Sequence, residues 1–284
     1  MVSSKPDLHQ VVAAALAEDL GESNVDVTTS SVIDADLLGE AVVVARKPGV
    51  LSGGDAAARV FEMIRPPSQY VALVADGKRL EAGSEVARIT GSLSSILIGE
   101  RTALNFLQRL SGIATLTRRY ADALAPFPRV TLLDTRKTTP GLRALERAAV
   151  RAGGGHNHRA GLWDAILIKD NHVAAAGSVG EAIRRARNAA MPVEVEVDTL
   201  EQLAEALDAG AEIVLLDNMP AEMMRKAVEI TAGRAQLEAS GGITLEGAVS
   251  AAQAGVDRIS VGALTHSAPA LDLSLEVKRT WRQR

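Results

Sequence analysis

The sequence predicts an α/β protein whose second half forms a barrel of parallel strands and helices. Short apolar strands alternate with amphipathic helices from residue 129 onward, a pattern typical of a parallel sheet with helical crossovers. Apolar β-rich runs and one long helical stretch precede that region. With 284 residues and 47% hydrophobic content, the chain can form one large domain or two smaller ones with buried cores.

The first half is predicted to begin with a helix, continue as strands and end with a long helix. Residues 6–20 show helical periodicity, and Gly21 ends the pattern. Strands are predicted at the apolar runs 41–45, 70–74 and 85–89. Residues 94–124 predict the long helix, which Gly112 can bend or break.

The second half contains six predicted strands and five predicted helices. The strands lie near 130–134, 165–169, 193–197, 212–216, 236–239 and 257–261, and the helices begin near 140, 178, 200, 220 and 244. A complete barrel of this type has eight strands, so either the barrel is incomplete or a strand is missed. The tail at 271–277 alternates apolar and polar residues, and we expect it to return to the first half as a strand.

The composition excludes several classes of function. Without cysteine, the chain has no disulfide, no thiolate metal site and no cysteine nucleophile. A pI of about 5.8 and an aromatic content of 2% argue against a nucleic-acid partner. No apolar run approaches the roughly 20 residues of a membrane helix, and the N-terminus lacks a signal-peptide core. We therefore expect a cytoplasmic protein with no membrane partner.

Residues 134–172 form a basic, glycine-containing segment in a chain whose net charge is -4. Its basic side chains outnumber its acidic ones. The basic residues are Arg136, Lys137, Arg143, Arg147, Arg151, Arg159 and Lys169, the acidic ones are Asp134, Glu146, Asp164 and Asp170, and the histidines are His156, His158 and His172. A local cationic cluster of this kind predicts a site for a small polyanion.

A helix is predicted over residues 140–152, within this segment. Thr139 can cap it, and Pro140 fits the first helical position, where no amide donor is needed. Gly153 can supply the left-handed turn after it. The arginines of this helix share one face, and the simplest interpretation is a solvated surface.

Three positions in this basic segment can bind anions. In a barrel, the loop at 134–138 is expected to belong to the active site, and Arg136 and Lys137 supply a planar fork and a point charge there. The turn at 153–159 offers donors from its histidines and Arg159; a helix-capping turn or a two-histidine metal site are alternatives, although the guanidinium opposes a metal. Lys169 ends a strand, as either an anion donor or a Schiff-base nucleophile.

Carboxylates and glycines follow other strands. Residues 193–197 alternate valine and glutamate, so the acids share one face. In a barrel strand these acids would point inward and need cations or a metal beside them, with Lys169 as a candidate partner; an exposed edge strand is the alternative. Asp217 follows its strand in the same way. The glycines at 240–242 and 261–263 can expose backbone amides to a phosphate.

Several sequence strings at these positions resemble the quinolinate phosphoribosyltransferase family. They are EDLG at 18–21, DVTT at 26–29, ERTALNFLQRLSGIAT at 100–115, DTRKTTPGLR at 134–143, GGGHNHRAGLWDAILIKDNH at 153–172, EVEVD at 194–198, LLDNM at 215–219, SGGI at 240–243 and VGALTHS at 261–267. The resemblance covers nearly the whole chain, and the order of DTRKT, NHR and IKDNH is its most specific part. The acidic-pair strand motif of ordinary phosphoribosyltransferases is absent.

The resemblance implies the type II phosphoribosyltransferase fold, an N-terminal α/β sandwich domain plus an incomplete α/β barrel. The sandwich would span 1–115 and be completed by 271–284, and the barrel, carrying the active site, would span 116–270. It also implies a homodimer with shared active sites. The implied reaction converts quinolinate and phosphoribosyl pyrophosphate, with Mg²⁺, into nicotinate mononucleotide, carbon dioxide and pyrophosphate.

The resemblance also assigns roles to residues. Quinolinate would be bound by Arg136, His158, Arg159 and Lys169, together with Arg101 of the partner subunit. Lys137 would serve the pyrophosphate or its boundary with quinolinate, while Glu196 and Asp217 would hold Mg²⁺, directly or through water, and the ribose hydroxyls; these three are the candidate catalytic residues. The other substrate-binding candidates are Thr135, Ser240, Gly241, Gly242, Val261, Gly262 and Ala263.

Three alternatives remain open. A phosphoribosyltransferase of the same fold, of the molybdenum-transport-associated type, would act on another acid; NHR and the full IKDNH favour quinolinate. A Schiff-base aldolase would use Lys169 as its nucleophile. A non-catalytic anion-binding protein would not need inward acids at 194, 196 and 198.

Overall fold

The computed structural model describes residues 8–189 and 191–282, which form two compact units. Unit 1 contains the described residues up to Leu116, Thr139–Gly154 and the described residues from Ala268. Unit 2 contains Thr117–Thr138 and Gly155–Ser267. The domain boundaries expected after residues 115 and 270 stay a prediction. None of the described helices has both the length and the apolar character needed to cross a membrane.

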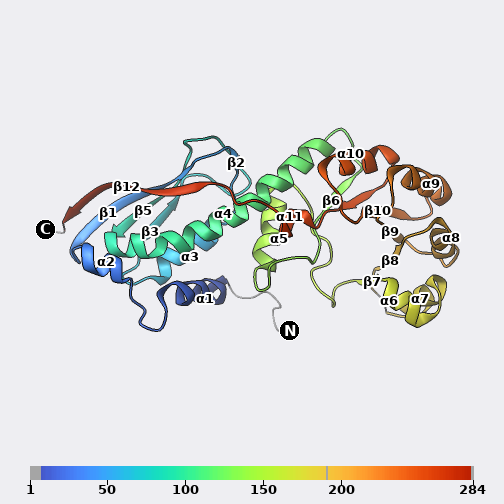
Figure 1. The fold of residues 1–284 in the computed structure, drawn as a ribbon, viewed down its shortest axis with the longest axis horizontal. Coiled ribbons are helices and arrows are strands. Elements are labelled where there is room, and N and C mark those ends of the chain that lie inside the picture. Colours follow the sequence, from blue (N-terminus) through green and yellow to red (C-terminus); the bar gives the residue numbers. More distant parts are fainter. Residues whose placement is uncertain (1–7, 190, 283–284) are drawn as a thin grey trace. The chain divides into compact units, whose positions relative to one another are not determined.

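Unit 1 is built around an antiparallel sheet with strand order β12-β1-β5-β3 (Figure 1). Its elements are α1 (Leu8–Leu20), α2 (Val27–Val32), β1 (Leu37–Ala45), β2 (Gly49–Val50), α3 (Gly54–Met63), β3 (Gln69–Ala72), β4 (Arg79–Leu80), β5 (Glu85–Ser92), the first part of α4 (Leu93–Leu124), α5 (Arg143–Ala152) and β12 (Leu273–Arg282). Strand β12 pairs with β1, with Leu275 opposite Val43. The prediction that the tail returns to the first half is therefore confirmed. Residues 6 and 7 of the first predicted helix lie outside the described residues.

A single hydrophobic core joins this sheet to its helices. Phe61 of α3, Ile89 of β5 and Leu107 of α4 are each 0% exposed. Helix α4 runs without interruption from Leu93 to Leu124, so the break considered at Gly112 is wrong. A Cβ atom at Gly112 would lie 2.1 Å from the carbonyl oxygen of Pro269. Glycine at this position therefore serves a close approach of two backbones.

Helix α5 begins three residues later than the sequence predicts. Gly141 has a φ of 82°, which breaks the helix in the turn before Arg143. Thr139 is not its cap residue; its amide and hydroxyl donate to the carboxylate of Glu146, at 3.0 and 2.8 Å. The left-handed residue after the helix is Gly154, with a φ of 91°, and not Gly153.

Unit 2 is the incomplete α/β barrel. Its elements are β6 (Thr131–Leu133), β7 (Ile166–Ile168), α6 (Asp170–Ala176), α7 (Val179–Ala186), β8 (Val193–Val197), α8 (Leu200–Asp208), β9 (Ile213–Asp217), α9 (Ala221–Thr231), β10 (Gln236–Ser240), α10 (Leu245–Ala254), β11 (Arg258–Ser260) and α11 (Ala263–His266). The six strands are parallel in the order β6-β11-β10-β9-β8-β7, and α7 to α10 lie outside them (Figure 1). In the segment that connects β6 to β7, His156 forms an isolated parallel bridge with Leu133 of β6. The predicted α/β class and incomplete barrel are confirmed.

Helices α6 and α11 were not predicted, because 7 and 4 residues are too few to show a helical period. The alternation predicted for β8 is confirmed. Val195 and Val197 are 0% and 1% exposed. The alternating acids, Glu194 and Glu196, lie on the opposite, inner face beside His158 and Lys169. Since all six strands are parallel, their carboxyl ends meet at one edge of the sheet.

Candidate active site

Polar groups from all six parallel strands gather at the carboxyl edge of the unit 2 sheet. They are Thr135, Arg136 and Lys137 after β6, Lys169 after β7, Glu196 in β8, Asp217 in β9, Ser240, Gly241 and Gly242 at the end of β10, and Val261, Gly262 and Ala263 after β11. His158 and Arg159 join them from the segment beside β6. The structure thus brings together every predicted site residue except Arg101, which is exposed on α4 in unit 1.

Two guanidinium groups form the centre of the cationic side. Burial, together with the charge of Arg136, lowers the pKa of Arg159. Arg159 Nη1 donates to the carbonyl oxygen of Ala165 at 3.1 Å. The Nε of Arg136 is buried and, within the described part of the chain, has no hydrogen-bond partner. Like charges this close repel one another, so an anion bound between them would stabilise the arrangement.

The ring of His158 is held by protein groups at both nitrogens. Its Nε2 lies 3.0 Å from Glu194 Oε2 and 3.4 Å from Glu238 Oε1. Its Nδ1 accepts the amide hydrogen of Arg159 at 2.8 Å. Burial alone would lower the pKa of His158, but hydrogen bonds and charge from the two glutamates raise it to about 9. A proton on Nδ1 would have to displace the Arg159 amide, and this opposes the charged form. The role of His158 as a quinolinate donor stays a prediction.

Asp134 fixes the backbone that carries His158. It is 0% exposed and accepts hydrogen bonds from Asn157 Nδ2 at 2.6 Å and from the His158 amide at 2.7 Å. The other two histidines of the basic segment do not join the cluster. The His156 side chain is exposed, and His172 Nδ1 accepts the Lys169 amide at 2.9 Å at the start of α6.

The acidic side of the site begins at Lys169. Its Nζ lies 2.5 Å from Glu196 Oε2, so the predicted pairing of this lysine with an inward acid is confirmed. Beyond this pair is a hollow of about 350 Å³ lined in part by Asp170, Glu196, Asp198 and Asp217. Mg²⁺ commonly takes one or two protein carboxylates and completes its shell with water and substrate phosphates. The carboxylates that line this hollow fit such an ion.

Two glycine loops complete the edge. Gly241 and Gly242 have φ values of 92° and 56°, and a Cβ on Gly241 would lie 2.3 Å from Asn218 Oδ1. A Cβ on Gly262 would lie 3.2 Å from Lys137 Cδ, so the lysine chain packs directly on this glycine. Side chains at these positions would fill the space beside the backbone amides, which is why glycine suits a phosphate cradle.

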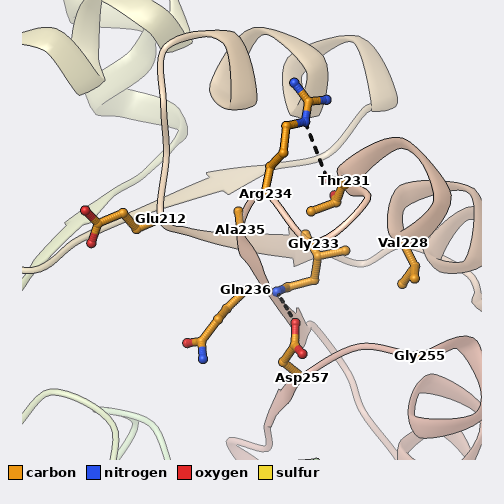
Figure 2. A pocket seen from close by; sticks show the side chains of 10 residues that line it. Glu212, Val228, Thr231, Gly233, Arg234, Ala235, Gln236, Gly255 and Asp257 are labelled. Carbon is orange, nitrogen blue, oxygen red and sulfur yellow. Dashed lines mark hydrogen bonds between the residues drawn. The ribbon is translucent and has the colours of Figure 1, made fainter.

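A second hollow, of about 410 Å³, lies at the amino side of β10 and β11 (Figure 2). Arg234 Nε donates to the Thr231 carbonyl oxygen at 3.4 Å, and Asp257 Oδ2 accepts the Leu237 amide at 2.9 Å. No predicted site residue lines this hollow. In barrels of this kind, groups at the amino ends of strands serve stability and those at the carboxyl ends serve chemistry.

Sequence reasoning missed the inward residues of β10 and β11. Glu238 is 0% exposed and its Oε2 lies 3.0 Å from Arg258 Nε. The signal was present, because Glu238 stands between Leu237 and Ala239 in the same alternation that identified the acids of β8. Its partners could not be identified without the strand order.

Comparison with known proteins gives the same picture over both halves of the chain. The family models for the N-terminal and C-terminal domains of quinolinate phosphoribosyl transferase match residues 26–111 and 113–276. The chain belongs to the quinolinate phosphoribosyltransferase family. The nicotinate-nucleotide pyrophosphorylase (carboxylating) of Mycobacterium leprae is 45% identical over 273 residues, 94% of this chain and 95% of that protein.

Two further relatives extend the comparison. The chloroplastic nicotinate-nucleotide pyrophosphorylase (carboxylating) of Arabidopsis thaliana is 42% identical over 292 residues, covering 95% of this chain and 83% of that protein. The solved structure of the nicotinate-nucleotide pyrophosphorylase of Francisella tularensis superposes with a TM-score of 0.90 at 40% identity, over 95% of this chain and 96% of that one. The fold is therefore shared with the Francisella tularensis structure over nearly the full length of both chains.

Proposed function

We propose that this chain is a decarboxylating quinolinate phosphoribosyltransferase of NAD biosynthesis. It would join quinolinate to the ribose of phosphoribosyl pyrophosphate and release nicotinate mononucleotide, carbon dioxide and pyrophosphate. The observation that carries the proposal is the pair of electrostatically coupled guanidiniums, Arg136 and Arg159, at the same sheet edge as the Glu196 and Asp217 carboxylates. A pyridine dicarboxylate needs the first pair, and a sugar that develops positive charge needs the second.

The cationic side would bind the two carboxylates of quinolinate. Arg136 and Arg159 offer planar forks that suit bidentate contact with a carboxylate. Lys169 adds a point charge, and its ion pair with Glu196 orients the ammonium group. An ammonium group in an ion pair has no free electron pair for attack on a carbonyl, which disfavours the Schiff-base alternative.

The acidic side would act on the sugar. As the pyridine nitrogen attacks C1 of the ribose and the bond to pyrophosphate breaks, positive charge develops on the ribose ring. Glu196 and Asp217 would stabilise that charge and bind the ribose hydroxyls. The bond between C2 of the pyridinium and its carboxylate then breaks, and the carboxylate leaves as carbon dioxide. The electron pair stays on C2, where the positive ring nitrogen stabilises it, and a proton from solvent joins C2 to give nicotinate mononucleotide. No covalent enzyme intermediate is needed.

The phosphates would be held by Lys137 and the glycine loops. Gly241, Gly242 and Gly262 would present amides to the 5-phosphate, and Lys137 would contact the pyrophosphate. Glu196 and Asp217 would also hold Mg²⁺, directly or through water; when bound, this ion neutralises charge on the leaving pyrophosphate.

We also propose a homodimer with shared active sites, in which Arg101 of the partner subunit contacts quinolinate. Arg101 is exposed on α4 of unit 1, which agrees with a role outside its own unit. In this proposal, residues 116–270 form the catalytic domain, and 1–115 with 271–284 form the domain that brings Arg101.

The decisive experiment is a coupled product analysis. The protein is incubated with phosphoribosyl pyrophosphate, Mg²⁺ and either quinolinate or nicotinate, and mononucleotide and carbon dioxide are measured together. We expect equal amounts of both products from quinolinate and no mononucleotide from nicotinate. Mononucleotide from nicotinate alone would support the alternative acid, and no product from either acid would refute the proposed function.

A further inference from the structure

Two buried glutamates contact the ring of His158, in the cationic side of the proposed quinolinate site. Glu238 of β10 is 0% exposed, Glu194 of β8 is 5% exposed, and each has an oxygen within 3.4 Å of His158 Nε2. Neither belongs to the groups assigned above to substrate or magnesium. They are separated by strand β9, so the imidazole ring bridges across the inner face of the sheet.

Burying two carboxylates is costly, so the presence of these two glutamates needs a reason beyond packing. Removing a carboxylate from water costs several kcal/mol unless partners compensate, and apolar residues would fill the same space at lower cost. Arg258 compensates Glu238, with Nε 3.0 Å from Oε2. Within the described part of the chain, Glu194 Oε1 and both carboxylate oxygens of Glu238 lack a hydrogen bond of normal geometry. Glu194 Oε2 lies 3.0 Å from the His158 ring.

The His158 ring also contacts the backbone of Arg159, which is proposed to bind the substrate. His158 Nδ1 accepts the amide hydrogen of Arg159 at 2.8 Å, on the side of the ring opposite Nε2. The charge of Arg136 acts on Arg159, and Arg159 Nη1 donates to the Ala165 carbonyl oxygen. A rotation of the ring would therefore release the backbone of Arg159.

We propose that Glu194 and Glu238 are positioning residues that hold the His158 ring and, through it, the backbone of Arg159 in the geometry that takes the dicarboxylic acid. The inference rests on the proposed function for the identity of that acid. It concerns the orientation of one side chain, so removing either glutamate should affect the acid and leave the phosphoribosyl donor alone.

A divalent metal ion is the competing use of these three side chains. The ligand atoms of His158, Glu194 and Glu238 lie within 4.8 Å of one another. The guanidinium of Arg258 already supplies positive charge to Glu238, and it would repel a metal ion at the same carboxylate. The contacts of the two glutamates with His158 and Arg258 therefore explain the cluster better than metal ligation.

The test uses Glu194→Gln and Glu238→Gln, which keep shape and remove charge. The matched control is Glu212→Gln, the same change at an exposed position before β9 in the same unit. We expect each test variant to raise the KM for quinolinate roughly tenfold, the size of one charge-assisted hydrogen bond. The KM for phosphoribosyl pyrophosphate should stay within about twofold of the wild-type value, because the His158 ring is proposed to position only the acid. Equal changes in both KM values would overturn the proposal.

A double variant separates positioning from general destabilisation. If Glu238 acts through the ring, His158→Asn combined with Glu238→Gln should bind quinolinate no more weakly than His158→Asn alone, because coupled residues are not additive. Additive losses would contradict the proposal.

Nitrogen-15 NMR of the His158 ring, without substrate, provides a readout independent of catalysis. Both glutamine variants should shift the Nε2 signal, and the control should not. An unchanged signal, or a stoichiometric divalent metal in the purified protein that is lost in Glu194→Gln, would overturn the proposal. If neither variant folds, the wild-type protein still tests the proposal: a spectrum that shows no proton on His158 Nε2 would overturn it. If the Nε2 signal shifts in both variants but the wild-type protein does not turn over quinolinate, the proposed function is refuted. The positioning of the His158 ring by the two glutamates would still stand.

Discussion

The charge of Arg159 should contribute measurably to quinolinate affinity. Replacing it with alanine removes one charge-assisted contact, which costs about 1.5–3 kcal/mol, or roughly a 10- to 150-fold rise in Kd. The pKa of Arg159 is lowered first by burial and second by the charge of Arg136. The change to alanine also removes this repulsion between the two arginines. We therefore expect the lower part of that range, about tenfold to thirtyfold.

Isothermal titration calorimetry with quinolinate measures this effect directly. Arg159→Lys should give an intermediate Kd, because it keeps the charge but loses the fork and the contact with the Ala165 carbonyl oxygen. Arg225→Ala, a charge removal at an exposed position on α9, is the matched control. If Arg159→Ala binds quinolinate within twofold of the wild-type Kd while Arg225→Ala does the same, the reasoning about the cationic side is refuted.

Four further predictions follow from the same geometry. Glu196→Gln should lower kcat more than it weakens quinolinate binding, and steady-state kinetics beside calorimetry would reject the charge-stabilising role if kcat were unchanged. Gly241→Ala, at a φ of 92°, should raise the KM for phosphoribosyl pyrophosphate and leave the Kd for quinolinate unaltered. Against the effect of burial, the two glutamates raise the pKa of His158 to about 9, whereas the contact of Nδ1 with the Arg159 amide requires a neutral ring. A charged ring would contribute stability that is fully present below pH 6.5 and is lost as pH rises through 9. Because the Arg159 amide occupies Nδ1, we expect urea titrations at pH 6.5 and 9 to show the same change in the wild type and in Glu238→Gln; a larger loss in the wild type would show a charged ring and contradict the Nδ1 contact. Glu146→Gln should lower the free energy of unfolding by about 3 kcal/mol, because it removes the buried negative charge that faces Arg109, whose Nη2 lies 2.8 Å from Glu146 Oε1; a loss below 1 kcal/mol in urea titration argues against that estimate.

Much of the barrel was predictable because its signals are local. The valines and glutamates of 193–197 alternate with the period of a strand, and the structure places them on opposite faces. The position of Lys169 after an apolar run also predicted an inward partner, which is Glu196. Predictions failed where a backbone conformation overrides propensity, as at Gly141, whose left-handed turn delays the start of α5.

Contacts between distant strands were not predictable in the same way. Nothing near Glu238 in the sequence indicates that it shares an imidazole with Glu194, and nothing near Asp134 indicates that it binds the amide of His158. By itself the sequence determined which residues alternate, which follow strands and which family the motifs resemble, because those properties depend on neighbours along the chain. Only the tertiary structure decided which charges meet, because the order of parallel strands, set by packing across the whole sheet, places side chains from different strands around one ring.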